Sequence, residues 1–297
     1  MSLTVGFVIN DLGHGGAQKQ VALLAAALKP YLDVRVYVMS ALEHPYAPSL
    51  REHGIPVTTF QRRSHADVGR FVALTRALGT DRVDVVHAFL DASNAYAFLA
   101  TRVVRKPVIM SLRSDRFTIS GLRASALRSM MRRVDAVTTN SRAGVSLLVD
   151  SVGVDRDRVI LVPNVTATVS LPPADPSPGL IGCVGRLVEL KRVDLIIRAL
   201  PLVRASLPGA RLEVVGNGPA RPALQALAQE LGMSDAVMFT GAVEDATSYI
   251  ARHACLVLAS TFEGLPNAAL EALAAGVPVV APPVGDVASI VSDGSTG

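Results

Sequence analysis

Short runs of apolar and β-branched residues alternate along this chain with Ala- and Leu-rich helical stretches, and this alternation restricts the possible folds more than any other feature. In the first part, the strand-like runs are residues 4–9, 33–39, 55–59, 83–87, 108–112, 136–139 and 159–162. The helical stretches between them include residues 17–28, 68–78 and 95–104. Because parallel strands need long crossover connections, usually helices, this order predicts an α/β fold with a parallel sheet covered on both faces.

A proline-rich stretch divides the chain. Residues 165–179 contain four prolines and no periodic pattern, which is typical of a linker. A second alternating set follows, with strand-like runs at residues 180–184, 211–215, 237–240, 256–259 and 278–281 and helical stretches at residues 193–205, 220–231 and 268–275. The sequence therefore predicts two Rossmann-like domains, residues 1–164 and 180–297. Since open α/β sheets bind ligands beyond the carboxyl ends of their strands, we expect a ligand in a cleft between the domains.

Composition argues against several classes of protein. No run of about 18 apolar residues occurs, so we expect no membrane-spanning helix. The N-terminus lacks the basic region of a signal peptide, and the lone cysteines Cys183 and Cys255 suit a reducing cytoplasm. Neither these cysteines nor the six scattered histidines form a metal-ligand pattern, so we expect no metal and no cofactor.

Positive charge is concentrated in one stretch of the chain. Residues 102–133 hold nine Arg and Lys residues against one acid, Asp115, although the net charge of the whole chain is only +4. We expect no nucleic-acid partner, because only Phe117 in this stretch could stack on a base. An anionic membrane surface or a phosphorylated acceptor fits the charge better, and a basic amphipathic helix over residues 121–134 would provide the contact. An ordinary packed helix is the alternative.

The stretch at residues 260–281 contains the start of a helix. Asn267 is a favourable N-cap, residues 268–275 are helix formers, and Gly276 is typical of a helix end. The first N–H groups of a helix have no partners inside it, so those of residues 268–270 can bind an anion such as a pyrophosphate.

Two carboxylates flank this helix start. Glu263 precedes it, and we expect Glu271 in its first turn. Carboxylates do not bind a phosphate, but they accept hydrogen bonds from sugar hydroxyls, so the combination predicts a ligand that carries both groups. In the alternative, each acid only stabilises the helix dipole.

A glycine-rich segment joins the first strand to the first helix. Gly13, Gly15 and Gly16 allow close approach of the backbone to a ligand, and the helix start behind them favours phosphate. A turn that needs a positive φ at Gly13 is the alternative. The dinucleotide-binding pattern fails because Gln18 stands at the third glycine position, and no Gly-Lys pair is present to form a P-loop.

Two cations follow the first strand of the second set. Arg186 offers a planar fork of donors, and Lys191 is a mobile point charge five residues later. Two cations facing a pyrophosphate would offset its charge and support it as a leaving group. Two solvated surface charges are the alternative.

These motifs together resemble the donor site of retaining GT-B glycosyltransferases, in particular family 4. The resemblance is carried by Glu-Gly-x-Pro-Asn at residues 263–267, the seven residues between the two glutamates, and Ala-x-Gly-x-Pro-Val-Val at residues 274–280. Gly-Arg-Leu-x-x-x-Lys at residues 185–191, Gly-x-Gly-Pro at residues 216–219 and Gly-Gly-Ala-Gln at residues 15–18 also resemble loops of the family. Arg192 departs from the glycine that usually follows the lysine, which implies a stiffer turn or a third cation.

The resemblance implies transfer of a sugar from a nucleotide sugar, most often UDP-linked, to a hydroxyl of a glycan or lipid-linked acceptor, with retention at the anomeric carbon. It implies catalytic roles for His87, Arg186, Lys191 and Glu263, although a histidine satisfied in the core is the alternative for His87. The implied donor-binding residues are Gly15, Gly16, Arg186, Lys191, Gly216, Asn217, Val243, Glu263, Gly264, Leu265, Pro266, Asn267 and Glu271. Acceptor contacts are expected from Asn94 and Arg113.

The last residues resemble an internal segment of the family. Asp-Gly-x-Thr-Gly at residues 293–297 follows a helix expected at residues 287–291, and in family members further elements come after it. We therefore expect a second domain that lacks its C-terminal end. The alternatives in function are a GT-B epimerase and a non-catalytic nucleotide-sugar-binding module or inactive fragment. The expected location is the cytoplasm, with the inner face of the membrane as a more specific alternative.

Overall fold

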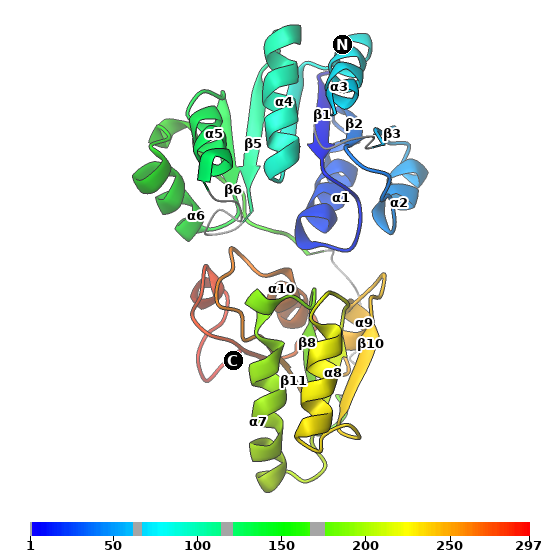
Figure 1. Cartoon of the computed structure of the whole chain (residues 1–297), viewed down its shortest axis with the longest axis vertical. Coiled ribbons are helices and arrows are strands. Elements are labelled where there is room, and N and C mark those ends of the chain that lie inside the picture. Colours follow the sequence, from blue (N-terminus) through cyan, green and yellow to red (C-terminus); the bar gives the residue numbers. More distant parts are fainter. Residues whose placement is uncertain (1, 62–66, 114–120, 167–175) are drawn as a thin grey trace. The chain divides into compact units, whose positions relative to one another are not determined.

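The computed structural model describes residues 2–61, 67–113, 121–166 and 176–297, and it divides into two compact units, Met1–Pro163 and Asn164–Gly297 (Figure 1). Most of the expected linker, residues 167–175, lies outside the described residues. Each unit is built on one parallel sheet with helices, so the prediction of two Rossmann-like α/β domains is confirmed.

The first unit holds a seven-stranded sheet in the order β3-β2-β1-β4-β5-β6-β7. Its strands are β1 Thr4–Ile9, β2 Asp33–Val38, β3 Val57–Thr59, β4 Val85–Phe89, β5 Val108–Leu112, β6 Ala136–Thr139 and β7 Val159–Leu161. Its α-helices are α1 Gly16–Leu28, α2 Tyr46–Glu52, α3 Val68–Thr80, α4 Asp91–Val104, α5 Gly121–Met131 and α6 Arg142–Ser146. Every neighbouring pair of strands is parallel.

Strand β1 shows why the sheet needs helices on both faces. Side chains alternate in direction along a strand. Phe7 and Ile9 therefore pack in a core with Leu50 of α2, whereas Val8 between them packs in a second core with Leu74 of α3. A strand that is apolar on both sides can be buried only between two layers of helices.

The second unit holds a five-stranded parallel sheet in the order β10-β9-β8-β11-β12. Its strands are β8 Leu180–Val184, β9 Arg211–Val215, β10 Val237–Gly241, β11 Cys255–Val257 and β12 Val279–Val280. Its α-helices are α7 Val193–Ser206, α8 Arg221–Glu230, α9 Thr247–Ile250 and α10 Asn267–Ala274. The strand order reverses between β8 and β11, as it does between β1 and β4 in the first unit, and such switch points are where open α/β sheets bind ligands.

Several elements differ from the sequence prediction. The helix expected at residues 287–291 is a single 3₁₀ turn, Val287–Ser289, and α2 and α6 were not predicted because both are short. Helix α4 begins four residues earlier than expected. It follows Leu90, which has φ +74° and ψ 156°, and Asn10 Oδ1 accepts a hydrogen bond from the N–H of Ser93 in its first turn. No helix in the described part of the chain is both long and apolar enough to cross a membrane.

Candidate functional site

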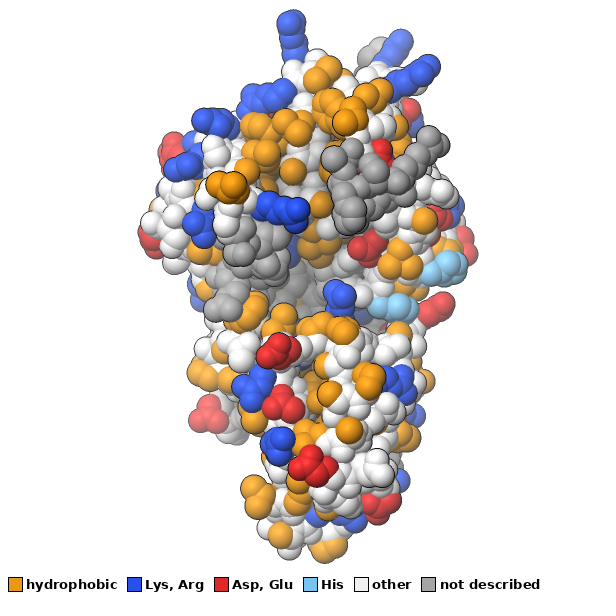
Figure 2. Space-filling model, viewed as in Figure 1, with side chains coloured by type: hydrophobic (Ala, Val, Ile, Leu, Met, Phe, Trp, Pro, Cys, Tyr) orange, Lys and Arg blue, Asp and Glu red, His pale blue; other side chains and the backbone are white. Residues whose placement is uncertain are grey.

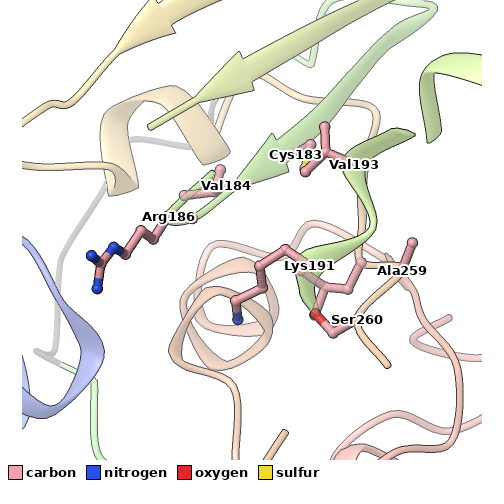
Figure 3. Close-up of a pocket in the computed structure, with 9 residues that line it drawn as sticks. Cys183, Val184, Arg186, Lys191, Val193, Ala259 and Ser260 are labelled. Atoms are coloured by element: carbon pink, nitrogen blue, oxygen red, sulfur yellow. The ribbon is translucent and has the colours of Figure 1, made fainter. Parts of the chain in front are cut away.

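The switch point of the second unit contains a small pocket between the ends of β8 and β11 (Figure 3). The pocket is lined by Cys183, Val184, Gly185, Arg186, Lys191, Val193, Leu258, Ala259 and Ser260. Arg186 and Lys191, which sequence motifs single out, therefore lie beside the same opening. Their side chains extend in different directions from the loop after β8, as Figure 3 shows.

Lys191 and Glu263 form an ion pair beside this pocket. Lys191 ends a 3₁₀ turn, Glu189–Lys191, and its Nζ donates a hydrogen bond to Glu263 Oε1. The same carboxylate oxygen accepts a hydrogen bond from Ser260 Oγ at 2.7 Å. The turn and the loop after β11 are also joined through their backbones, because the N–H of Thr261 donates to the carbonyl of Leu190 at 2.9 Å. The structure thus brings together two residues separated by 72 positions that the sequence predicted to share a ligand.

Two glycine loops pack backbone against backbone next to Arg186. The N–H of Gly185 donates to Val215 O at 2.9 Å, and the N–H of Leu187 donates to Asn217 O at 3.0 Å. Gly216 has φ +139°, and a Cβ there would lie 1.9 Å from the carbonyl oxygen of Gly185. Only glycine fits this contact, so the close approach explains the Gly-x-Gly motif without requiring a ligand.

Two further residues of the expected donor site, Asn217 and Val243, belong to the loops after β9 and β10. The Asn217 side chain accepts a hydrogen bond from the next N–H, that of Gly218, at 2.9 Å. Val243 lies two residues after β10, and the last residue of that strand, Gly241, accepts a hydrogen bond from the N–H of Gly216 at 2.8 Å. The loops after β9 and β10 are therefore neighbours.

The start of helix α10 differs from the prediction in one respect. The helix begins at Asn267, with Pro266 in the N-cap position and no side-chain cap, so the prediction of Asn267 as the N-cap is wrong. The Asn267 side chain instead accepts a hydrogen bond from Asn164 Nδ2 at 2.7 Å, and the same Nδ2 donates to Leu265 O at 2.7 Å. Pro266 is extended, at φ −72° and ψ 123°, which suits the residue before a helix.

This shift of one residue moves the helix groups expected to bind anions. The N–H of Leu270 already donates to Pro266 O at 3.3 Å, so the N–H groups that begin the helix are those of residues 267–269 rather than residues 268–270. Glu271 correspondingly lies in the second turn, not the first, and is buried. Gly264 and Leu265 belong to the loop that leads into the helix.

Sequence reasoning missed Gly285, whose backbone packs against the loop that carries Glu263. The N–H of Asp286 donates to Gly264 O at 2.8 Å. Gly285 has φ +57°, and a Cβ at this position would lie 2.2 Å from the carbonyl oxygen of Glu263. The available signal was a Gly-Asp pair in the loop five residues after the last strand, β12, because Gly and Asp are common in turns.

The side chain of Arg192, the candidate third cation, is bound to Asp194. It has φ +48°, the left-handed conformation that glycine adopts without strain, and this explains why the family usually has glycine here. Its guanidinium donates two hydrogen bonds to the Asp194 carboxylate, with Nε–Oδ1 and Nη2–Oδ2 distances of 3.1 and 3.2 Å. The hydrogen bond to Asp194 raises the pKa of Arg192, and the bond from Arg192 lowers the pKa of Asp194.

In the first unit, His87 lies in β4 within a small polar network. Its Nε2 is 2.9 Å from Ser111 Oγ and 3.1 Å from Thr138 Oγ1, and these two hydroxyls are 2.6 Å apart. Burial, with a smaller contribution from the charge of Arg113, lowers the pKa of His87 to about 3. The imidazole is therefore neutral at ordinary pH. Its hydrogen-bond partners are two hydroxyls of the neighbouring strands β5 and β6, which is the arrangement expected for a histidine satisfied in the core.

The two expected acceptor residues are held by the fold of the first unit. Asn94 is fully buried, and its Nδ2 donates to Ser111 O at 3.1 Å, so an acceptor could reach it only if α4 moved. Burial lowers the pKa of Arg113 to about 10, and its guanidinium lies over the Phe89 ring, 5.2 Å from the centroid.

Gly15 and Gly16 begin helix α1. Gly15 occupies the N-cap position, and Gly16 is the first helical residue. The preceding turn is organised by Asp11, whose Oδ1 accepts hydrogen bonds from the N–H of Gly13 and from Gln18 Nε2, both at 2.9 Å. Gly13 has no positive φ, so the alternative that required one is wrong.

The basic stretch contains a helix whose apolar side is only partly buried. In α5, Leu127 and Met131 are buried, but Leu122 is 90% exposed. Asp115 and Phe117 lie outside the described residues. Within the described part of the chain, no group of three or more His, Cys, Asp or Glu residues could hold a metal ion.

Comparisons with known proteins agree with this fold. The profile of the "Glycosyl transferase 4-like domain" matches residues 15–165, and that of "Glycosyl transferases group 1" matches residues 178–297. HepE from Anabaena, solved in complex with UDP-glucose, superposes with a TM-score of 0.87 over 99% of this chain and 84% of that chain, at 19% identity. TarM from S. aureus superposes with a TM-score of 0.81 over 100% and 89% of the two chains, at 10% identity.

Curated relatives match parts of the chain at higher identity. A GDP-mannose-dependent alpha-(1-6)-phosphatidylinositol monomannoside mannosyltransferase from Mycolicibacterium smegmatis is 37% identical over 158 residues, which cover 49% of this chain and 40% of that protein. A D-inositol 3-phosphate glycosyltransferase from Nocardia farcinica is 32% identical over 57% of this chain and 42% of that protein. The matches thus span less than half the length of these relatives. Since the first profile covers more than half of this chain and the second most of the remainder, the protein belongs to the GT-B glycosyltransferases with a glycosyl transferase 4-like domain.

Proposed function

We propose that this protein transfers a hexose from a nucleoside diphosphate sugar to a hydroxyl of a glycan or lipid-linked acceptor, with retention at the anomeric carbon. The observation that carries the proposal is the Lys191–Glu263 pair at the β8/β11 switch point, with Arg186 on the same pocket. A cation suited to a phosphate and a carboxylate suited to sugar hydroxyls stand side by side, which matches a ligand that contains both groups.

Each residue has a separate task in the proposed reaction. Arg186 and Lys191 stabilise the negative charge that grows on the departing diphosphate as the glycosidic bond stretches. The N–H groups that begin α10 add positive potential. Glu263 accepts hydrogen bonds from the transferred sugar, and Glu271 accepts them from the ribose.

Retention follows in this proposal from attack on the face that the diphosphate leaves. A double displacement would need a carboxylate free to act as a nucleophile. In the proposed complex Glu263 is held by Ser260 and accepts hydrogen bonds from the sugar hydroxyls, and Glu271 is buried in the second turn of α10. Neither carboxylate is placed as a nucleophile, so the leaving phosphate itself accepts the proton of the acceptor hydroxyl.

The base of the donor nucleotide has two candidates, uracil and guanine, and experiment decides between them. The mycobacterial relatives are named as GDP-mannose-dependent, whereas HepE was solved with UDP-glucose. The sequence resemblance favours UDP, and the higher sequence identity of the mycobacterial match favours GDP.

A membrane-facing acceptor fits the surface of the first unit. Helices α3 and α4 pack together, and their exposed residues include Val68, Val72, Leu99 and Val103. The view in Figure 2 shows apolar and cationic side chains side by side on this unit. Apolar side chains among Arg and Lys residues suit an anionic bilayer, which would place the protein at the inner face of the membrane. Sedimentation with phosphatidylglycerol vesicles, but not with phosphatidylcholine vesicles, is the expected result.

Turnover tests the proposed function. Purified protein is incubated with UDP- and GDP-hexoses and a lipid extract or glycan acceptor, and release of the nucleoside diphosphate is followed with and without acceptor. Acceptor-dependent release that is lost in Lys191→Ala is expected. Nucleotide binding without release would favour a non-catalytic binding module, and conversion of the donor sugar without transfer would favour an epimerase.

A further inference from the structure

The carboxylate of Glu263 has two hydrogen-bond donors of different kinds. Ser260 Oγ donates to Oε1 at 2.7 Å from a nearly inaccessible position, since Ser260 is 2% exposed. Lys191 Nζ donates to the same oxygen from a side chain that is 28% exposed, while the Glu263 side chain is 13% exposed. The serine is thus the inner partner of the carboxylate and the lysine the outer one.

The two donors also differ in how far they can move. A lysine ammonium lies at the end of a flexible four-carbon stem and can turn to another acceptor without backbone movement. A serine hydroxyl lies only two bonds from its Cα and moves by rotation about a single bond. The backbone of the adjacent residue is anchored by the hydrogen bond from the Thr261 N–H to Leu190 O at 2.9 Å. Lys191 can therefore move much farther from Glu263 than Ser260 can.

The proposed function requires Lys191 to leave. If its ammonium neutralises the diphosphate of the donor, it cannot keep its full interaction with Glu263, and that carboxylate must then face the transferred sugar without its ion-pair partner. We propose that Ser260 is a positioning residue that holds Glu263 in place while Lys191 turns from the carboxylate to the diphosphate. When the donor binds, the sugar hydroxyls replace Lys191 as hydrogen-bond donors to Glu263.

This inference rests on the proposed function and has a distinct consequence for affinity. A nucleoside diphosphate without sugar draws Lys191 away and leaves Glu263 short of a donor, whereas a nucleotide sugar supplies the missing donor. The site therefore prefers the intact donor over the product, and Ser260 contributes to this preference by keeping the carboxylate aimed at the sugar.

Three variants of the whole chain test the inference. Ser260→Ala removes the inner hydrogen bond, and Ser260→Thr restores a hydroxyl at the same position. Thr261→Val is the matched control, because it removes a hydroxyl from the adjacent residue, which is exposed and bonds to Leu190 O at 3.2 Å rather than to Glu263. The Kd of UDP or GDP, the Kd of the corresponding nucleotide sugar, and kcat are measured for each.

Ser260→Ala is expected to lower kcat and the affinity for the nucleotide sugar by roughly 10- to 100-fold, the size of a lost hydrogen bond to a charged group. The affinity for the free nucleoside diphosphate stays within about twofold of wild type, because Lys191 remains available. Ser260→Thr regains part of the loss, and Thr261→Val resembles wild type. A parallel loss of affinity for nucleotide and nucleotide sugar in Ser260→Ala would overturn the inference, as would an unchanged kcat.

Glu263→Gln tests the Lys191–Glu263 ion pair by a measurement that does not depend on turnover. Without the negative charge Lys191 is no longer held, so the affinity for the free nucleoside diphosphate should rise by about threefold or more. An unchanged or lower affinity would show that the pair does not restrain Lys191. A wild-type chain that binds no nucleotide at all would instead refute the proposed function, and the two failures are thereby distinguished.

Discussion

Replacing Gly285 by alanine should damage the site although it changes none of the residues proposed to contact the donor. A Cβ at this position would lie 2.2 Å from Glu263 O and 2.3 Å from Gly264 O, whereas Cβ contacts under 3.0 Å essentially never occur. The loop that carries Glu263 must therefore move by about 0.8 Å, the difference between these two distances. A misplacement of about 1 Å at a catalytic group costs on the order of 100-fold in rate, so a loss of this size in kcat is expected for Gly285→Ala.

Gly276 provides the matched control for this substitution. It has φ +74°, close to the +57° of Gly285, but a Cβ added there meets no atom within 4 Å. Gly276→Ala therefore meets only the left-handed backbone cost of about 1–2 kcal/mol in unfolding free energy and keeps its turnover. Gly285→Ala meets the same cost and also displaces the Glu263 loop.

Urea denaturation and steady-state turnover, measured on both variants, separate the two effects. Equal stability and equal turnover in Gly285→Ala and Gly276→Ala would refute the argument that Gly285 fixes the Glu263 loop. A loss of turnover in Gly285→Ala at the stability of the control would support it.

Three further predictions concern other described residues. The folded-state pKa of His87, about 3, lies below its ordinary value of 6.5, so the unfolded chain binds the proton first and stability falls as pH drops below 6.5. The loss is about 2 kcal/mol between pH 7.5 and pH 5, and urea denaturation at both pH values should show a smaller loss in His87→Gln. Glu213 is buried against His253, with Oε2–Nε2 at 2.8 Å, so Glu213→Ala should lower the unfolding free energy by about 3–5 kcal/mol, measured by the same method. A cost near zero would show that the buried acid is not needed by its partners. Because Arg192 is engaged by Asp194, Arg192→Gly should leave donor affinity within about twofold of wild type in calorimetry, and a tenfold loss would show that it contacts the diphosphate.

The sequence predicted the sheets well because their strands are short runs of apolar and β-branched residues. Residues 4–9 and 136–139 were expected as strands and are β1 and β6 with the same bounds. A short run of this kind has few alternatives to a buried strand. The short loops between the runs and the helical stretches fix the alternation of strands and helices. Arg186 and Lys191 could be predicted as neighbours for the same reason, since both follow one strand within seven residues.

The remaining features depend on contacts between segments that are distant in sequence. Helix α4 starts early, and Asn10 Oδ1, directly after β1, accepts the N–H of Ser93 in its first turn. The side chain of Asn267 does not cap α10, because it is bound by Asn164, 103 residues earlier. Gly285 matters only because the Glu263 loop lies against it. Local propensity contains no information about such contacts, so these residues became visible only in the structure.

In the proposed function, the β8/β11 switch point of the second unit binds the diphosphate of a nucleotide through Lys191. Calorimetric titration of the chain with UDP, GDP and ADP, in wild type and in Lys191→Ala, tests it most directly. We expect one of the three nucleotides to bind and its affinity to fall by about tenfold or more in Lys191→Ala, the size of a lost charge-assisted hydrogen bond. Binding of no nucleotide by the folded chain, or equal binding by wild type and variant, would contradict this role of Lys191.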